Sequence, residues 1–200
     1  MNVIRTLRNL RIDLLTQRAF LGGGAPSIDG YKMILSTSNS GYEQLDLFFF
    51  NYYSIGENDV IVDVGCGKGR VLSYLLYKGV KNKMIGYEIN DIIGNKTKQH
   101  LSRYKNVDIR CENIFNNFPE NANVFYIYNP FREEMTNDFK EQIWKIRDKN
   151  QVILYYNPVC IAVFNDKRFV YDIKDVPPLD GYKMDIAIIR VADVKNWPPV

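Results

Sequence analysis

The strongest indication of this chain's fold is the segment Asp59-Val-Ile-Val-Asp-Val-Gly-Cys-Gly-Lys-Gly-Arg70. It opens with an apolar, β-branched run, which is typical of a strand buried on both faces of a parallel sheet. Gly65, Gly67 and Gly69 then end the strand in a turn, and apolar residues recur at helical spacing from Val71 onward. Strand, glycine turn and helix in this order form a nucleotide-binding unit, with the amino end of the helix facing the ligand.

The spacing of the glycines indicates which nucleotide is bound. The dinucleotide fingerprint is G-x-G-x-x-G, whereas here the glycines alternate and Arg70 stands at the place of the third fingerprint glycine. An acidic residue, Asp63, precedes the first glycine by two positions. This pattern resembles the first motif of the class I S-adenosylmethionine (SAM)-dependent methyltransferases, D/E-x-G-x-G-x-G. The alternative is a purely structural role, as a tight strand-to-helix turn. The resemblance implies that SAM is the cofactor, S-adenosylhomocysteine the product, and the binding residues Asp63, Gly65, Cys66, Gly67 and Gly69.

Two further strand ends carry groups suited to a nucleoside. The apolar run 83–89 places Glu88 about 20 positions after the glycines, where a carboxylate accepts hydrogen bonds from both ribose hydroxyls. A third strand, 107–111, precedes Glu112 and Asn113. In the methyltransferase family an acidic residue at this place binds the adenine amino group. Asn113 aligns with it and Glu112 adjoins it, so both are candidates for the adenine contact.

The fourth predicted strand, 123–128, ends in Asn129-Pro130-Phe131. Proline lacks a donor and restricts the residue before it, so we expect the strand to end with Asn129 extended. The tripeptide resembles a shortened [D/N]-P-P-[Y/F/W] motif of methyltransferases that modify amino nitrogens. The resemblance implies that Asn129 and Pro130 accept hydrogen bonds from the target amine, that Phe131 stacks on a planar substrate, and that Asn129 also faces the cofactor. The second proline of that motif is missing, and an ordinary strand-ending turn is the alternative.

Tyrosines and amides recur around this place. The fifth predicted strand, 151–156, also ends in Tyr-Asn-Pro, so the two copies should lie side by side at the carboxyl edge of the sheet. A polar loop and helix before the glycine strand bring Ser38, Ser40 and Tyr42 within possible reach of the amino-acid end of SAM or of the acceptor. Tyr42 is therefore a catalytic candidate. If a base is needed, the candidates are Tyr42, Glu112 and Tyr156.

Composition narrows the function classes. The chain has 200 residues, three cysteines without a C-x-x-C pair, and one histidine, so we expect no metal site and no histidine-based nucleophile. Residues 1–20 lack the apolar core of a signal peptide and no run is long enough to span a bilayer, which favours the cytoplasm. The net charge of +3 equals that of residues 1–20, which carry four arginines and one aspartate. The neutral remainder favours a small-molecule acceptor; nucleic acid and protein acceptors stay open.

The sequence predicts two parts. Residues 1–34 form a basic amphipathic helix and a glycine-rich hinge, and residues 35–200 form the methyltransferase domain. The helix packs through Val3, Leu7, Leu10 and Leu14 onto the domain or a second copy of the chain. A membrane-surface or nucleic-acid contact through its arginines, or a transit peptide, is the alternative.

The expected fold is α/β. It has a Rossmann-like, seven-stranded, mostly parallel sheet in the order 3-2-1-4-5-7-6, with helices on both faces and an N-terminal helical cap over the site. A closing hairpin of the strands 168–174 and 183–191 distinguishes this sheet from that of a dehydrogenase. The predicted function is methyl transfer from SAM to an unidentified acceptor, an amine or hydroxyl of a small molecule. The alternatives are a non-catalytic SAM-binding module and an NAD-dependent oxidoreductase, against which Arg70 and the hairpin argue.

Overall fold

The computed structural model describes residues 3–22, 40–147, 150–176 and 184–192. Within them seven strands form one sheet in the predicted order β3-β2-β1-β4-β5-β7-β6. The first five strands are parallel, β7 is antiparallel to β5, and β6 is antiparallel to β7. The strands are β1 (Val60–Val64), β2 (Lys83–Tyr87), β3 (Val107–Arg110), β4 (Val124–Ile127), β5 (Val152–Tyr156), β6 (Phe169–Lys174) and β7 (Ile186–Val191).

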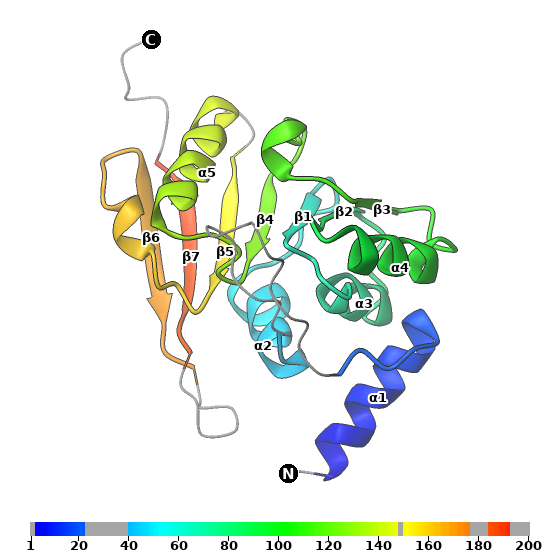
Figure 1. Ribbon diagram of the computed structural model, residues 1–200. Coiled ribbons are helices and arrows are strands. Elements are labelled where there is room, and N and C mark those ends of the chain that lie inside the picture. The colour runs from blue at the N-terminus through cyan, green and yellow to red at the C-terminus, as the bar shows by residue number, and fades with distance from the viewer. Residues whose placement is uncertain (1–2, 23–39, 148–149, 177–183, 193–200) are drawn as a thin grey trace.

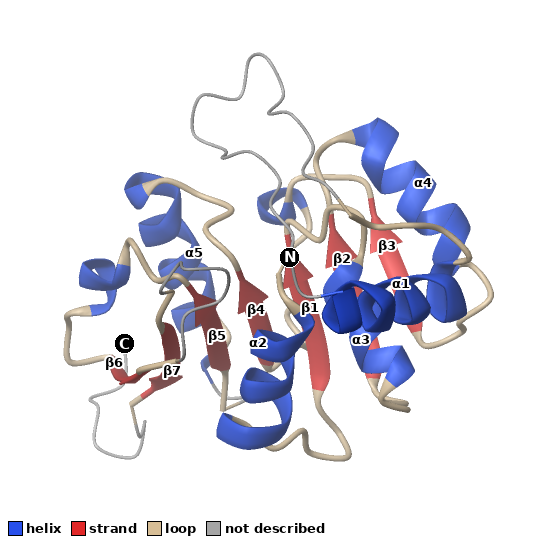
Figure 2. Ribbon diagram, turned by 90° about the horizontal axis from the view of Figure 1, so that it is seen from below, coloured by secondary structure: helices blue, strands red, loops and turns tan. Residues whose placement is uncertain are grey.

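Helices cover both faces of the sheet, as predicted. The central strands β4 and β5 are therefore buried on both sides. Figure 2 shows α5 (Glu133–Lys145) on the opposite side of the sheet from α2 (Tyr42–Asp46). With α2 lie a π-helical turn, Leu47–Tyr52, and the helices α3 (Arg70–Tyr77) and α4 (Asp91–Leu101). With α5 lie two short 3₁₀ turns, Ile114–Asn116 and Ile161–Phe164.

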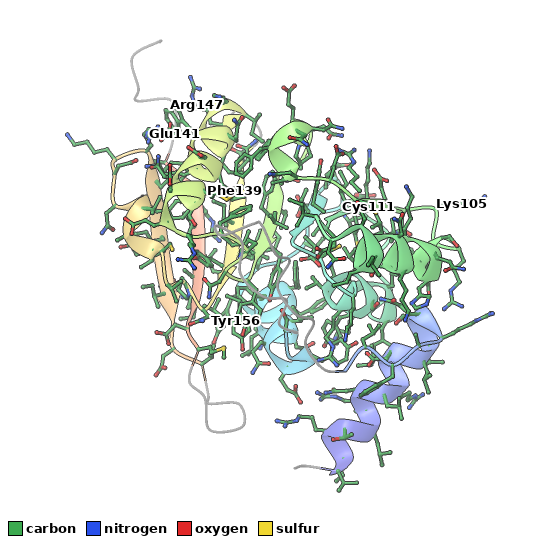
Figure 3. The ribbon with its side chains drawn as sticks, viewed as in Figure 1. Lys105, Cys111, Phe139, Glu141, Arg147 and Tyr156 are labelled. Carbon is green, nitrogen blue, oxygen red and sulfur yellow. The ribbon has the colours of Figure 1, made fainter. Side chains whose placement is uncertain are left out.

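Two apolar clusters form the core, one on each face of the sheet. Successive residues of β1 belong to different clusters, Ile61 to one and Val62 to the other, as the two-residue period of a strand requires. Phe139 of α5 and Tyr156 of β5, both labelled in Figure 3, also belong to different clusters. The sheet is thus the middle of three layers, and its carboxyl edge stays accessible between them.

The N-terminal helix α1 (Val3–Gln17) packs against α3 and α4 (Figure 1) and contributes Ile12 to the core cluster on that face of the sheet. The predicted apolar face does not pack on the domain, because Val3, Leu7 and Leu14 are 64%, 60% and 48% exposed. Packing of this face on a second copy of the chain stays a prediction. The buried residues are instead Ile12, Asp13, Thr16 and Gln17. Three of these four are polar. Gln17 donates to the backbone oxygen of Lys68 and to the hydroxyl of Ser73, and Asp13 accepts from the hydroxyl of Tyr42, so hydrophobicity did not mark this face.

The predicted division at residue 34 falls outside the described residues, as do most of the glycine-rich hinge and the hairpin turn. The division therefore stays a prediction. Among the helices that the structure describes, none combines the length and hydropathy that a membrane crossing requires.

Candidate functional site

A cleft opens at the carboxyl edge of the sheet, where β1 lies between β2 and β4 and the strand order reverses. This is the place at which open α/β sheets bind ligands. Of the residues predicted for the site, those that line it are Asp63, Gly65, Cys66, Glu88, Glu112, Asn113, Asn129, Pro130 and Phe131. Gly67, Gly69 and Tyr42 do not line it.

The glycine turn follows β1, and its three glycines have φ angles of 75°, 51° and 72°. Such left-handed angles strain other residues. At Gly69 a Cβ would also lie 2.8 Å from Cγ2 of Thr97, so the turn packs tightly on α4. At Gly65 a Cβ would lie 3.3 Å from Cβ of Pro130. The glycine turn and the Asn-Pro-Phe strand end, separate motifs in the sequence, are therefore neighbours in the cleft.

Glu88, at the end of β2, holds the glycine turn in place. Its Oε2 accepts a hydrogen bond of 2.8 Å from the backbone N–H of Gly67, and its Oε1 accepts one of 2.8 Å from that of Asn90. Burial raises the pKa of this carboxyl, and the backbone donors oppose that shift. Each carboxylate oxygen retains a second lone pair. Glu88 can therefore support the turn and also accept bonds from a ribose, the role that the sequence predicts for it.

Asp63 is the most strongly perturbed acid of the cleft. Its side chain belongs to β1, is 2% exposed, and has a buried Oδ2 without a hydrogen-bond partner among the described residues. Burial, and then the charge of Glu88, raise the pKa of Asp63 to about 8. A cation in the cleft would stabilise the ionised form and give the oxygen a partner. Asp63 is thus a site for a positively charged group.

Asn129 differs from the expected extended residue. Its φ is 44°, in the left-handed region, and the same is true of Asn157 at 51°. Proline disfavours a helical conformation before it, but asparagine tolerates the left-handed region better than other side chains, so the chain turns here. Oδ1 of Asn129 is buried without a partner in the described part of the chain. An unusual backbone and an unpaired amide at one cleft residue point to a role in binding.

Phe131 lines the cleft, but its ring is only 5% exposed. It packs against Phe115 and Phe139, with ring centroids 5.4 and 5.9 Å away. The placement does not offer a free face for the predicted stacking on a planar substrate. The ring belongs mainly to the core beneath the site.

Of the three predicted bases, only Glu112 lines the cleft. The hydroxyl of Tyr42 donates to buried Asp13 instead of reaching the cleft, and Tyr156 is a core residue. Burial raises the pKa of both phenols, that of Tyr156 to about 12, so neither is a ready base. Glu112 lines the cleft and makes no hydrogen bond within the described residues, whereas Oδ1 of Asn113 already accepts from the N–H of Phe115. Of the two candidates for the adenine contact, Glu112 thus has both carboxylate oxygens available, whereas the Asn113 oxygen already accepts one bond.

Ser40, which the sequence placed near the amino-acid end of SAM, lines the cleft, whereas Ser38 falls outside the described residues. Tyr128 of the first Tyr-Asn-Pro segment lines it as well, with its ring 4.6 Å from that of Tyr156. Tyr126 was not predicted; it lines the cleft and shares a hydrogen bond of 2.6 Å with the hydroxyl of Ser40. The alternation along β4 could have indicated it. Arg70 also lines the cleft, although its only predicted significance was that it breaks the dinucleotide fingerprint.

The single histidine lies outside the cleft. Nδ1 of His100 is 3.2 Å from Oε1 of Gln17, so the ring helps attach α4 to α1. Across the described ranges, no three or more His, Cys, Asp or Glu side chains are grouped so that they could hold a metal ion.

Comparison with known proteins gives one curated relative and many similar folds. No family model matches the chain. Over 157 residues it is 33% identical to the ribosomal RNA small subunit methyltransferase A of Thermotoga maritima, an alignment covering 70% of this chain and 54% of that protein. The chain thus spans about half the length of the curated relative it matches.

Solved structures with similar folds include an RNA methyltransferase from Salinibacter ruber in complex with S-adenosylhomocysteine. It has a TM-score of 0.57 and 16% identity, over 80% of this chain and 95% of that one. The M1A22 tRNA methyltransferase of B. subtilis has a TM-score of 0.58 and 15% identity, over 76% and 65%. A SAM-dependent methyltransferase from Aquifex aeolicus has a TM-score of 0.57 and 14% identity, over 77% and 100%. At these identities the likeness concerns the fold.

Proposed function

We propose that this chain, which has the fold of the class I SAM-dependent methyltransferases, is itself a methyltransferase that uses SAM. One observation carries the proposal: two buried oxygens without partners, Oδ2 of Asp63 and Oδ1 of Asn129, belong to a single cleft. Both accept hydrogen bonds and favour a positively charged ligand. The pyrophosphate of NAD would bring negative charge to the same acceptors, which argues against the oxidoreductase alternative.

The residues of the cleft fit the parts of SAM. Asp63 suits its ammonium group, Glu88 its ribose hydroxyls, and Glu112 its adenine amino group. When bound, SAM supplies a methyl group on a positively charged sulfur, which is already a good leaving group. The protein's contribution is then mainly alignment of the acceptor, for which effective molarities reach about 10⁵ M or more. Asn129 and Pro130 are the residues to provide it, because they end β4 beside the glycine turn.

The acceptor that we propose is a nitrogen of an RNA base. The curated relative is named as a ribosomal RNA methyltransferase and the B. subtilis structure as a tRNA methyltransferase, which supports RNA over a small molecule. The Asn129-Pro130-Phe131 strand end supports a nitrogen, through its resemblance to the motif of amino-modifying enzymes. Its Asn oxygen has no other partner in the described chain and is thus available to an N–H group.

Calorimetric titration with S-adenosylhomocysteine tests the cofactor, with NADH as the control ligand. We expect micromolar binding of the first and none of the second. Asp63→Ala should abolish binding, while Asp172→Ala, at an exposed position of β6, should bind as the wild type does. If folded wild-type protein does not bind S-adenosylhomocysteine, the proposed function is wrong.

Labelled SAM tests the acceptor. The protein is incubated with total cellular RNA, and separately with a small-molecule extract. We expect the label to become insoluble in acid with RNA and to become soluble again after ribonuclease treatment. Label in the small-molecule fraction alone would overturn the RNA proposal. Binding of S-adenosylhomocysteine without transfer to either fraction would favour the non-catalytic SAM-binding module.

A further inference from the structure

Arg70 begins α3 directly after the glycine turn, and its side chain lines the cleft. The side chain is 13% exposed, so this cation is largely removed from water. Its guanidinium carbon lies 4.7 Å from the centre of the Tyr42 ring, which fixes the plane of the group. A charged group held in this way next to a ligand site needs an explanation beyond packing.

The guanidinium is poorly paired for a buried cation. It carries five N–H donors in a fixed fork. One nitrogen, Nη1, donates to the backbone oxygen of Ser40 at 3.4 Å, and Nη2 lies 3.8 Å from Oδ2 of Asp13. Both contacts are long, and Nε is buried with no partner among the described residues. The group therefore has unused capacity for a good bidentate acceptor such as a carboxylate.

Asp13 does not use up this capacity. It is a fully buried residue of α1, and its oxygens accept from the hydroxyl of Tyr42 and, at 3.0 Å, from the backbone N–H of Leu21. It compensates the charge of Arg70 from a distance and keeps the arginine in place. Because the closest approach is 3.8 Å, this is an ion pair without the short, parallel bonds of a closed fork.

The other charges of the cleft restrict the kind of anion. Three acids, Asp63, Glu88 and Glu112, line the same space as the two cations Lys68 and Arg70, so the cleft suits a ligand that carries both a positive and a negative group better than one with several negative charges. Asp63 precedes the glycine turn and Arg70 follows it, which places one acceptor and one donor group at the two sides of the same turn. A zwitterion with an ammonium and a carboxylate on one carbon satisfies both. The methionine end of SAM is such a zwitterion.

We infer that Arg70 binds the α-carboxylate of SAM through its guanidinium fork, and that Asp13 and Tyr42 position it. The inference rests on the proposed function, because it assigns one part of the cofactor to one residue. It gives a reason for the arginine at the place of the third fingerprint glycine. It also makes α1 a part of the cofactor site, although no residue of α1 lines the cleft.

The test compares two ligands in the same variants by calorimetry: S-adenosylhomocysteine, and 5′-methylthioadenosine, which has the same nucleoside and sulfur but no amino-acid group. For Arg70→Gln we expect the affinity for S-adenosylhomocysteine to fall on the order of 10- to 100-fold, as for a lost hydrogen-bonded charge pair. The affinity for 5′-methylthioadenosine should stay within about twofold of wild type. Arg70→Lys should be intermediate, because lysine supplies the charge without the fork.

The matched control is Arg11→Gln, an exposed arginine of α1 whose loss should change neither affinity. Since 5′-methylthioadenosine reports an intact nucleoside site in each variant, misfolding is recognised within the experiment. An equal loss for both ligands in Arg70→Gln would make Arg70 a structural residue and overturn the inference. An unchanged affinity for S-adenosylhomocysteine would overturn it too. Wild-type protein that binds neither ligand would instead refute the proposed function.

Discussion

The ends of β4 and β5 have the same local sequence, Tyr-Asn-Pro, and the same local backbone. Asn129 and Asn157 both have left-handed φ angles, and the preceding tyrosine rings are in contact. Their surroundings differ. Asn129 adjoins the glycine turn and has a buried, unpaired side-chain oxygen, whereas the backbone N–H of Asn157 donates to the oxygen of Asp185, next to β7.

The difference comes from topology. β4 pairs with β1 at the point where the strand order reverses, so its end faces an open cleft. β5 has β4 on one side and the antiparallel β7 on the other, so the start of β7 lies beside its end. A tripeptide alone therefore does not make a site. The neighbouring strands decide whether its asparagine lines the cleft, as Asn129 does and Asn157 does not.

The largest contrast that we expect concerns the residue after each proline. Phe131 is a buried ring between two others, while Val159 is 63% exposed. Phe131→Ala should lower the free energy of unfolding by about 3–5 kcal/mol, and Val159→Ala should change it by less than about 0.5 kcal/mol. Urea denaturation followed by circular dichroism measures both. Similar small changes would mean that the Phe131 ring is not part of the core.

The next contrast concerns methyl transfer. Asn129→Ala should lower the rate of labelled methyl incorporation into RNA on the order of 100-fold, because one lost contact misplaces the acceptor. Its affinity for S-adenosylhomocysteine should fall less. Asn157→Ala is the matched control and should keep the wild-type rate within about twofold. Equal loss of rate in the two variants would show that the strand ends matter only for folding.

Much of this arrangement follows from the sequence. The buried β1 run, the glycine turn and the acid after β2 depend on local pattern, and Gly65 and Glu88 indeed line one cleft. Local pattern did not predict the role of a side chain whose hydrogen-bond partner comes from a distant part of the chain. The hydroxyl of Tyr42 bonds to Asp13 of α1, and no spacing between residues 13 and 42 indicates this contact. The role of Arg70 likewise depends on what surrounds it in space.

The two strand ends should also differ in how they affect the pH dependence of binding, because only the end of β4 shares the cleft with Asp63. Asp63, in the cleft beside β4, has its pKa raised to about 8, so it is largely protonated at pH 6 when no ligand is bound. The ammonium group of S-adenosylhomocysteine, which Asp63 is proposed to bind, requires the ionised form. The affinity for S-adenosylhomocysteine should therefore rise with pH between 6 and 8, by up to about tenfold per unit, and level off above 8.

Calorimetry at several pH values measures this dependence. Asp63→Asn should bind more weakly and lose the dependence on pH. Asp185→Asn, a change beside the end of β5, should retain the dependence of the wild type. A wild-type affinity that does not change between pH 6 and 8 would contradict the assignment of Asp63 to the cationic part of the ligand.

The smallest expected effect is on the free energy of unfolding, and it tests the left-handed backbone that the two strand ends share. Because both asparagines have left-handed φ angles, glycine fits either backbone at least as well as asparagine does. Asn129→Gly and Asn157→Gly should each change the free energy of unfolding by less than about 1 kcal/mol, since relief of strain and the greater entropy of the unfolded chain oppose each other. Transfer should nevertheless be lost in Asn129→Gly alone, because only that change removes an amide from the cleft. Full activity of Asn129→Gly would mean that the turn, and not the side chain, is what the β4 end contributes.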